Sequence, residues 1–369
     1  MDNDQILEHD RPGRKSGIRR LVYRPPPDAP NARDGRKRRK CGTAQRRDER
    51  SWPEIKEQFQ RTLRRAPEVV IIVSGGRRGR DDDQAAIKGV LRYMLYISRN
   101  GRLLTVDEQG APIDGRYAIR ETHARWDIDM QRLRSARGEP LHPSFNIIFS
   151  MPARTEPNKV FNAVQAFARE HFQRHEYVMA LHTPETDPGK KVPEHPHVHV
   201  IVRAEDEDGK RLYIRKGTLR TWRERFAAEL RARGIDANAT PRAERGISLK
   251  AHSAAEWHID KRSEDEQRRG KEGRTISTAK LARFIEAAKE LDEGATEPKP
   301  WEVAMAARRR DELRKLEQSA ARLRQEGDVD LADQVERFMQ DMPPLDTERR
   351  QMQRALAERV RNRMQERGL

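Results

Sequence analysis

The chain has 369 residues, a net charge of +16 and a pI of about 10.1, with 37% charged against 35% hydrophobic residues. This balance favours an anionic partner, nucleic acid first, and predicts that part of the chain lacks a packed core. A single cysteine, Cys41, excludes an intrachain disulfide and a cysteine-based zinc site. Because no stretch approaches the roughly 20 apolar residues that span a bilayer, and because the N-terminus is acidic, we expect a cytoplasmic protein without membrane insertion.

Residues 1–65 are polar and basic. Between Arg11 and Arg50 they hold 15 Lys or Arg against 4 Asp or Glu, together with a run of three prolines. Such a composition cannot bury enough apolar surface to fold alone. We therefore expect a mostly disordered basic arm, whose positive charge helps to hold DNA.

Residues 66–250 are expected to form the compact domain. A buried strand is predicted over 68–74, and a helix follows Asp81-Asp82-Asp83 and ends at Asn100-Gly101. The glycines between 75 and 79 lack the Lys-Ser/Thr of a nucleotide-binding loop, which excludes that function. Further strands are expected at 145–151, 177–181 and 194–202, with helices around 160–172 and 218–234 and a turn at 208–209. This order predicts an α+β fold with a largely antiparallel central sheet flanked by helices.

Beyond residue 250 the composition changes again. Residues 251–300 are predicted to be a charged linker, and residues 301–369 a charged helical extension. Apolar residues there recur every three or four positions, as in Leu313, Leu316, Ala320 and Leu323. Narrow stripes of this kind are typical of helices that pair with one another or with a partner.

The run Glu194 to Val202 reads Glu-His-Pro-His-Val-His-Val-Ile-Val and holds three of the eleven histidines. A strand points every second side chain to the same face, so His195, His197 and His199 would stand in a row. A row of imidazoles suits a divalent metal ion or a phosphate group, although a solvated histidine patch on an edge strand has the same pattern.

This row fits two classes of enzyme. In the histidine-triad nucleotide hydrolases a strand histidine attacks an α-phosphate. In the His-hydrophobic-His endonucleases the histidines hold a metal ion that polarises a scissile DNA phosphate. The histidines alone do not decide between these classes, but the second class needs a nucleophile, which is usually a tyrosine.

Four segments in the right order over residues 66–250 point to that second class. They are Leu-Tyr-Ile-Ser-Arg-Asn-Gly at 95–101, Phe-Asn-Ile-Ile-Phe-Ser-Met-Pro at 145–152, Ala-Leu-His-Thr at 180–183 with His-Pro-His-Val-His at 195–199, and residues 221–227 with 237–246. Together they resemble the motifs of plasmid relaxases of the mobilisation type, the group that includes the T-DNA border endonuclease. The arm and the C-terminal helices lie outside this resemblance.

The resemblance implies a site. Its nucleophile would be Tyr96, with Tyr93 one helical turn earlier as the competitor, and its metal ligands His182, His197 and His199. It implies Mg or Mn as the metal, completed by phosphate oxygen and water. Possible phosphate contacts, or groups that orient the ligands, are His195, Asp187, Arg92 and Arg99.

Two departures from the family pattern affect the orienting group. The family has an Asp directly after His-Thr, where this chain has Pro184, and a shorter gap before the histidine pair. Asp187 is the expected substitute as the carboxylate that orients a metal-bound imidazole, with Glu185 and Glu194 equally placed.

The predicted function is a site- and strand-specific DNA relaxase. It would nick a plasmid or mobile-element origin of transfer, single-stranded or locally unwound, through a 5′-phosphotyrosyl intermediate. Its partners would be that DNA, relaxosome accessory proteins and a coupling protein. A histidine-triad hydrolase would need no tyrosine, and a non-catalytic basic accessory protein would bind DNA without cleaving it.

Overall fold

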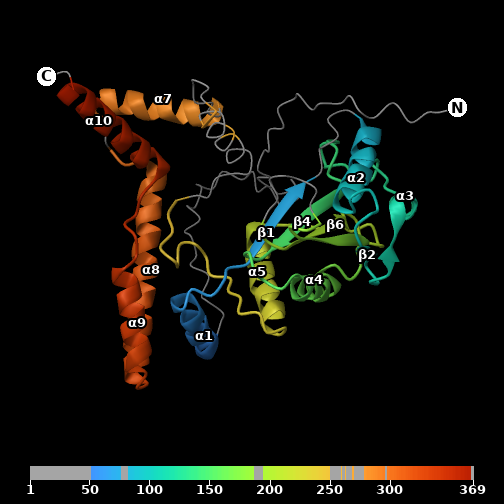
Figure 1. Ribbon diagram of the computed structural model, residues 1–369, viewed down its shortest axis with the longest axis horizontal. Coiled ribbons are helices and arrows are strands. Elements are labelled where there is room, and N and C mark those ends of the chain that lie inside the picture. Colours follow the sequence, from blue (N-terminus) through green and yellow to red (C-terminus); the bar gives the residue numbers. More distant parts are fainter. Residues whose placement is uncertain are drawn as a thin grey trace, which may run out of the picture. The chain divides into compact units, whose positions relative to one another are not determined.

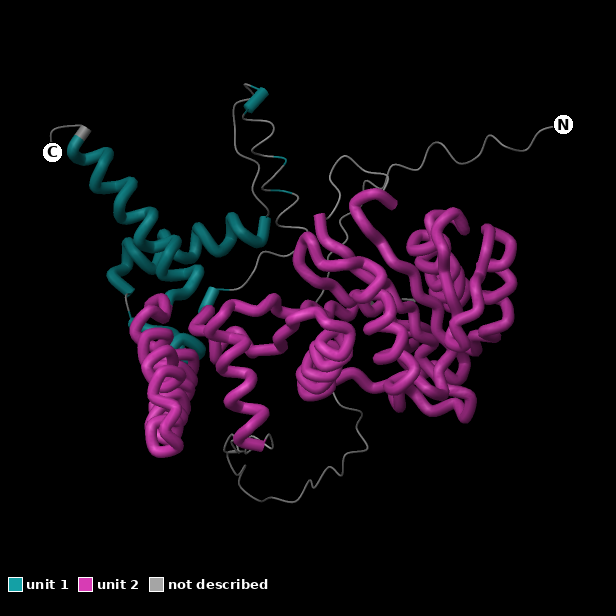
Figure 2. Tube along the Cα trace, turned by 60° about the horizontal axis from the view of Figure 1, so that its bottom comes forward, with its two compact units in different colours: residues 1–22, 248–303, 346–369 teal, residues 23–247, 304–345 magenta. Residues whose placement is uncertain are grey.

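The computed structural model describes residues 51–75, 82–186, 194–249, 278–295 and 297–366, with four further positions between 259 and 269. These residues form two compact units (Figure 2). The larger unit contains the described residues up to 247 together with 304–345. The smaller unit contains those of 248–303 together with 346–366. Among the described residues, no helix has the length and apolar composition to cross a membrane.

A six-stranded sheet forms the centre of the larger unit (Figure 1). The strand order is β1-β4-β6-β5-β2-β3, and every neighbouring pair is antiparallel. The strands are β1 (Val70–Gly75), β2 (Thr105–Asp107), β3 (Pro112–Ile113), β4 (Ser144–Ser150), β5 (Tyr177–His182) and β6 (His197–Arg203). The α+β class with an antiparallel sheet is therefore confirmed.

Helices α4 (Pro157–His171) and α5 (Lys216–Arg231) cover one face of the sheet (Figure 1). Alternate residues of the strands point to this face, and all three of the β6 valines are fully buried there. Phe149 of β4 packs edge-on against Phe167 and Phe226, with ring centroids 4.9 and 5.1 Å apart. This layer is the main hydrophobic core.

Helix α2 (Asp83–Ile97), with α3 (Gly115–Arg125) packed beside it, covers part of the opposite face. Buried apolar residues of α2, among them Met94 and Ile97, pack with Ala180 of β5 and Ile201 of β6. On β1 this face stays open, since Val70 and Ile72 are 43% and 52% exposed. The sheet therefore has one fully apolar face and one face that is only partly covered.

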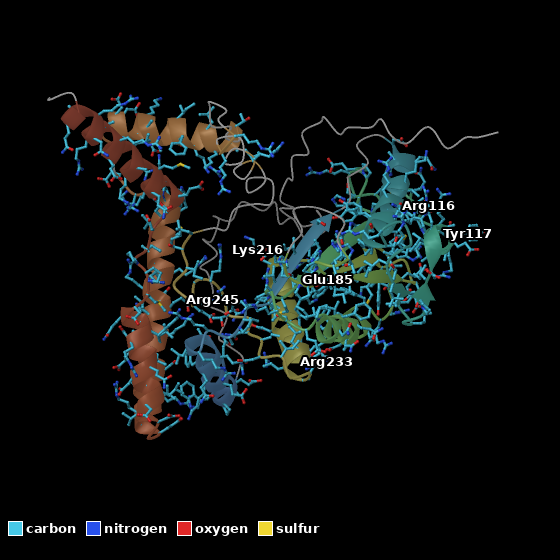
Figure 3. The ribbon with its side chains drawn as sticks, viewed as in Figure 1. Arg116, Tyr117, Glu185, Lys216, Arg233 and Arg245 are labelled. Atoms are coloured by element: carbon cyan, nitrogen blue, oxygen red, sulfur yellow. The ribbon has the colours of Figure 1, made fainter. Side chains whose placement is uncertain are left out.

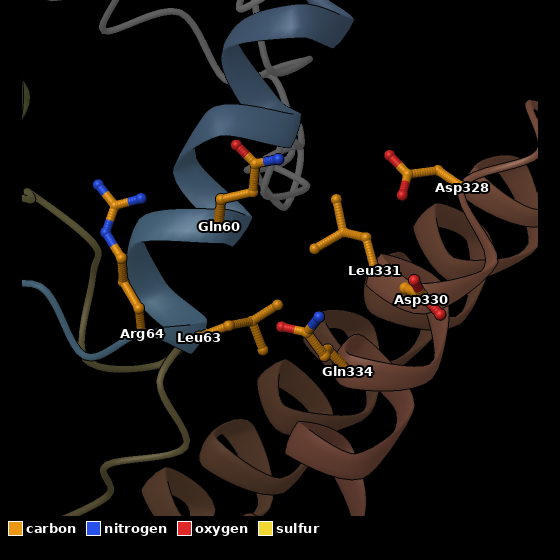
Figure 4. Close-up of a pocket in the computed structure, with 7 residues that line it drawn as sticks. All are labelled: Gln60, Leu63, Arg64, Asp328, Asp330, Leu331 and Gln334. Carbon is orange, nitrogen blue, oxygen red and sulfur yellow. The ribbon is translucent and has the colours of Figure 1, made fainter.

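A helix precedes the sheet, α1 (Trp52–Leu63), and packs against the hairpin of α8 (Pro300–Gln325) and α9 (Val329–Gln340) through a separate apolar cluster. Arg64 makes two hydrogen bonds to Asp236, which ties the end of α1 to the segment after α5. A shallow groove of about 530 Å³ lies between α1 and the start of α9 (Figure 4). None of its lining residues belongs to the predicted site.

In the smaller unit, α7 (Thr278–Asp292) packs on α10 (Glu348–Glu366). Buried ion pairs hold it together: Arg349 lies 2.5 Å from Glu290 and 2.9 Å from Glu302, and Thr347 donates to Glu302 at 2.7 Å. These carboxylates are 7% and 4% exposed. Such a network needs each partner in place, because a buried charge that loses its partner is costly.

Two expectations need correction. Helix α1 lies in the stretch 1–65 that we expected to be disordered; its apolar side chains, Phe59 and Leu63 among them, pack against the α8–α9 hairpin, which is distant in sequence. Residues 1–50 of that arm lie outside the described residues. Helix α7 likewise lies in the predicted charged linker 251–300 and is stabilised by α10. In addition, β2, β3 and α3 were not predicted: the two strands are too short to show a period, and α3 is mostly polar.

Candidate functional site

The register of β5 and β6 brings the predicted ligands together. His182, the last residue of β5, pairs directly with His197, the first residue of β6, and Ala180 pairs with His199. Side chains two residues apart on β6 share a face, so all three imidazoles lie on the face that α2 partly covers. Residues far apart on the chain therefore meet because β5 ends, and β6 begins, at the same edge of the sheet.

The three histidines form a compact cluster. Their ring centroids are 5.1 Å apart for His182–His197, 4.7 Å for His182–His199 and 5.3 Å for His197–His199. One nitrogen of each ring lies within 4.8 Å of the others, and all three residues are buried. Three ring nitrogens are therefore close enough together to be candidate ligands of one ion.

Hydrogen bonds fix the tautomers of the two β6 histidines. His197 Nδ1 donates to the carbonyl oxygen of His195 at 3.2 Å, since a carbonyl can only accept. His199 Nδ1 donates to Asn146 Oδ1, also at 3.2 Å. The amide of Asn146 is oriented in turn, because its nitrogen donates to Ser74 Oγ at 3.1 Å. Both histidines therefore keep the lone pair on Nε2 for a ligand.

His182 is held from both sides. Its Nε2 lies 2.8 Å from the carbonyl oxygen of Ile97 and must donate to it. That carbonyl belongs to the last turn of α2, where a helix leaves its carbonyls without internal partners. The remaining nitrogen, Nδ1, accepts a hydrogen bond from Arg99 at 3.0 Å. The last turn of α2 is thereby attached to the histidine cluster.

Burial keeps these imidazoles neutral. It lowers the pKa of His182 from 6.5 to about 4 and that of His199 to about 2, with smaller contributions from neighbouring histidines and Arg99. The pKa values of His197 and His195 are also lowered, again chiefly by burial. A neutral imidazole has the lone pair that a metal ion binds, so the cluster is ready to act as a ligand set near pH 7. The close approach and the neutral state of the three imidazoles fit a divalent ion, with the tautomers of His197 and His199 leaving Nε2 available.

Tyr96 lies beside this cluster, and Tyr93 does not. The ring of Tyr96 is 54% exposed, and its centroid lies 6.0 Å from that of His199 and 6.3 Å from that of His182. The guanidinium of Arg99 lies 5.0 Å from the same ring. Tyr93, one turn earlier, is half-buried and packs in the apolar cluster under α2. Of the two tyrosines, Tyr96 is thus the one that lies exposed beside the histidines.

The rest of that motif forms the turn that ends α2. Arg99, Asn100 and Gly101 have φ values of 50°, 59° and 79°, a left-handed run that closes the helix. Asn100 N donates to Leu95 O at 2.7 Å and Gly101 N to Ser98 Oγ at 3.1 Å. A Cβ at position 101 would overlap the backbone of Gly115 at the start of α3. Glycine is therefore required there for both its conformation and its size.

The other residues named from the sequence are placed differently. His195 precedes β6 and lies outside the three-nitrogen cluster, although its ring is 5.7 Å from that of His197. Arg92 is exposed on α2, one turn before Tyr96. Glu185 is exposed in the loop after β5 (Figure 3), where Thr183 lowers the pKa of its carboxyl. Asp187 lies outside the described residues.

Sequence reasoning missed the groups that orient the ligands. Within the described part of the chain, the groups that accept hydrogen bonds from the histidines are Asn146 and the backbone carbonyls of Ile97 and His195. The signal for Asn146 was present: it is a polar residue between Phe145 and Ile147 in an apolar strand. Its neighbours face the main core, so Asn146 faces the histidines.

Comparison with known families agrees with this geometry. Residues 96–235 match the family model "Relaxase: MobA/VirD2-like, nuclease domain". This part of the chain is therefore similar to a relaxase nuclease domain. The matched range starts at Tyr96 and includes the three histidines and Asn146. It lies within the region 66–250 over which the motifs occur, and it favours the endonuclease class over the histidine-triad hydrolases.

Two further comparisons extend this finding little. A solved structure from work on the molecular basis of vancomycin resistance transfer in Staphylococcus aureus is similar at 12% identity and a TM-score of 0.28, over 47% of this chain and 99% of that one. No curated protein matches the chain in sequence. The likeness to relaxases therefore rests on the family model, which matches residues 96–235.

Proposed function

We propose that this relaxase domain is a metal-dependent DNA strand transferase that nicks an origin of transfer. The Tyr96 hydroxyl attacks one phosphate of a single-stranded or locally unwound strand. The bond between that phosphorus and the 3′ oxygen breaks, which leaves a 5′-phosphotyrosyl link and a free 3′-OH. Because the phosphodiester is exchanged for another ester and is not hydrolysed, the enzyme can rejoin the strand later.

One observation carries the proposal. The exposed Tyr96 lies beside the buried three-histidine cluster, with its ring centroid 6.0 Å from that of His199 and 6.3 Å from that of His182. A phenol with a pKa of about 10 is a weak nucleophile near pH 7, and it needs positive charge close to the phosphate that it attacks. The resemblance implies Mg or Mn, bound by His182, His197 and His199. Such an ion would neutralise the phosphate and stabilise the charge that develops on it.

Each protein group has a definite part in this scheme. Asn146 and the His195 carbonyl hold the β6 imidazoles with their Nε2 lone pairs directed away from the backbone. The Ile97 carbonyl holds His182 and at the same time fixes the helical turn that carries Tyr96. Nucleophile and ligands are therefore positioned by one connected set of hydrogen bonds, as catalysis by proximity requires.

The DNA would be bound in the cytoplasm, mainly through positive charge. Residues 1–65 hold 19 Lys or Arg and 10 Asp or Glu, so they contribute +9 of the total +16. Relaxosome accessory proteins and a coupling protein are the further partners that we propose. The exposed apolar residues of α10, Val360 and Met364, are candidate contacts for them.

The direct test uses the full chain, a supercoiled plasmid that carries the cognate origin, and Mg or Mn. We expect a relaxed circle that stays covalently attached to protein after denaturation with detergent, and whose 5′ end is blocked. The same reaction with excess EDTA should leave the plasmid supercoiled. Nicking without attachment, or undiminished nicking in EDTA, would contradict the proposal.

A further inference from the structure

The contact between Arg99 and His182 involves an atom that the proposed metal site needs. Arg99 Nη2 lies 3.0 Å from His182 Nδ1, while His182 Nε2 lies 2.8 Å from the Ile97 carbonyl oxygen. A guanidinium and a carbonyl leave no choice of tautomer, since the first only donates and the second only accepts. The proton of His182 is on Nε2, and the lone pair is on Nδ1, under the guanidinium.

A metal ion would have to use that same lone pair. Nε2 cannot serve, because it carries the proton and is directed at the backbone of α2. Each imidazole nitrogen has one lone pair in the plane of its ring, so it either accepts a hydrogen bond or binds an ion. The Arg99 hydrogen bond and metal ligation by His182 therefore exclude each other.

The position of Arg99 lets its guanidinium reach both His182 and Tyr96. The turn that ends α2 holds the backbone of Arg99 in the left-handed region, with φ 50°. The Cα of Arg99 is therefore fixed, and its side chain extends from there. Its guanidinium lies both at His182 and 5.0 Å from the Tyr96 ring centroid. A side chain with this reach can leave His182 and remain above Tyr96, where the phosphate is attacked in the proposed reaction.

We infer that Arg99 occupies the metal-binding nitrogen of His182 while no ion is bound, and that an ion binds only when this hydrogen bond breaks. Arg99 is thus an internal competitor of the metal and a positioning residue for His182. The inference rests on the proposed function, because it assumes that His182, His197 and His199 bind one ion. It predicts that removing Arg99 strengthens metal binding, whereas removing a residue that merely supports the site would weaken it.

The test is a calorimetric titration of the full chain with Mn²⁺ in the absence of DNA. Arg99→Asn and Arg99→Gly are suitable variants, because Asn and Gly both tolerate a positive φ and preserve the turn. We expect both to bind Mn²⁺ about tenfold more tightly than the wild type, which corresponds to the loss of one charged hydrogen bond to the ligand nitrogen. Arg102→Gln is the matched control: it removes the same charge from an exposed position in the same loop.

The outcomes separate this inference from the proposed function. If the wild type binds Mn²⁺ and both Arg99 variants bind equally or more weakly, the competition is refuted while the metal site stands. If the wild type binds weakly or not at all and the variants bind, the inference is supported. If no variant and no wild type binds Mn²⁺, both the metal site and the inference fail. An equal gain in Arg102→Gln would show that net charge, and not the hydrogen bond, is responsible, which also refutes it.

Discussion

Strand β6 presents Val198, Val200 and Val202 to one face of the sheet and His197 and His199 to the other. The first face is closed by α4 and α5 into an apolar core. The second is only partly covered by α2, and there burial serves to keep imidazoles neutral next to an exposed tyrosine. Residues that are neighbours in sequence thus either pack in the core or form the histidine cluster, because alternate side chains of a strand point to opposite faces. Substitutions on the two faces should therefore separate stability from chemistry.

The largest effect is expected from the tyrosine on the partly covered face. Tyr96→Phe should reduce strand cleavage and the covalent protein–DNA adduct to background, because the attacking oxygen is lost. DNA binding and thermal stability should hardly change, since the hydroxyl belongs to an exposed side chain. Adduct formation with a labelled oligonucleotide measures this. Tyr93→Phe is the control, and loss of the adduct in Tyr93→Phe alone would move the nucleophile one turn back.

The two faces can be compared directly with one substitution on each. Phe149→Ala should lower the free energy of unfolding by about 3–5 kcal/mol through a cavity in the main core. His197→Ala should instead remove most divalent-ion binding with a smaller loss of stability, because two imidazoles cannot hold the ion. Chemical denaturation and metal titration of both variants check this. Metal binding retained in His197→Ala would remove that histidine from the site.

The orienting residue should have an intermediate effect. Asn146→Ala removes the acceptor of the His199 Nδ1 proton and should weaken metal binding about 10- to 100-fold. Asn146→Asp keeps an acceptor at that position and should retain the affinity. Calorimetric titration of the two variants distinguishes orientation from packing. Equal loss in both would show that the side chain acts only by filling space.

A smaller effect is expected from pH. The pKa of His199 is lowered to about 2 by burial, so below pH 6.5 the unfolded chain binds a proton that the folded chain does not. Stability is then lost as the pH falls, by about 1.4 kcal/mol per pH unit for this group. The His199→Gln variant lacks this pH-dependent loss. As the pH falls from 6.5 to 5, the variant should therefore become more stable relative to the wild type. An unchanged difference between the two proteins over that range would contradict the neutral buried imidazole.

The smallest effect is expected from the basic N-terminal residues, which precede the strands of the sheet in the sequence. Deleting residues 1–50 should weaken DNA binding at low salt and flatten its salt dependence, by a slope of roughly 0.7 per phosphate contact on a single strand. Sequence preference should remain, because contacts to the backbone carry little base information. Binding titrations at several salt concentrations test this. An unchanged slope would assign the arm to a role other than holding DNA.

The sequence by itself predicted strands β1, β4, β5 and β6, helices α2, α4 and α5, and the three histidines that the fold brings together. Alternation along β6 and the Leu-Tyr-Ile-Ser-Arg-Asn-Gly motif are local patterns, and local patterns report which residue types share a face or close a helix. The glycine of that motif was also readable as a helix end. The structure adds the reason why no larger residue fits at position 101, which is the backbone of Gly115.

Only the tertiary structure decided what surrounds each ligand. Asn146 and two backbone carbonyls accept hydrogen bonds from the imidazoles, and these groups reach the imidazoles through strand register and helix packing rather than through spacing in sequence. Helix α1 was missed for the same reason: its apolar stripe is stabilised by α8 and α9, far along the chain. The contact of Arg99 with His182 also joins residues 83 positions apart. Such hydrogen bonds and buried contacts form only when the fold brings distant segments of the chain together. A local pattern in a single sequence does not show which distant segments will meet.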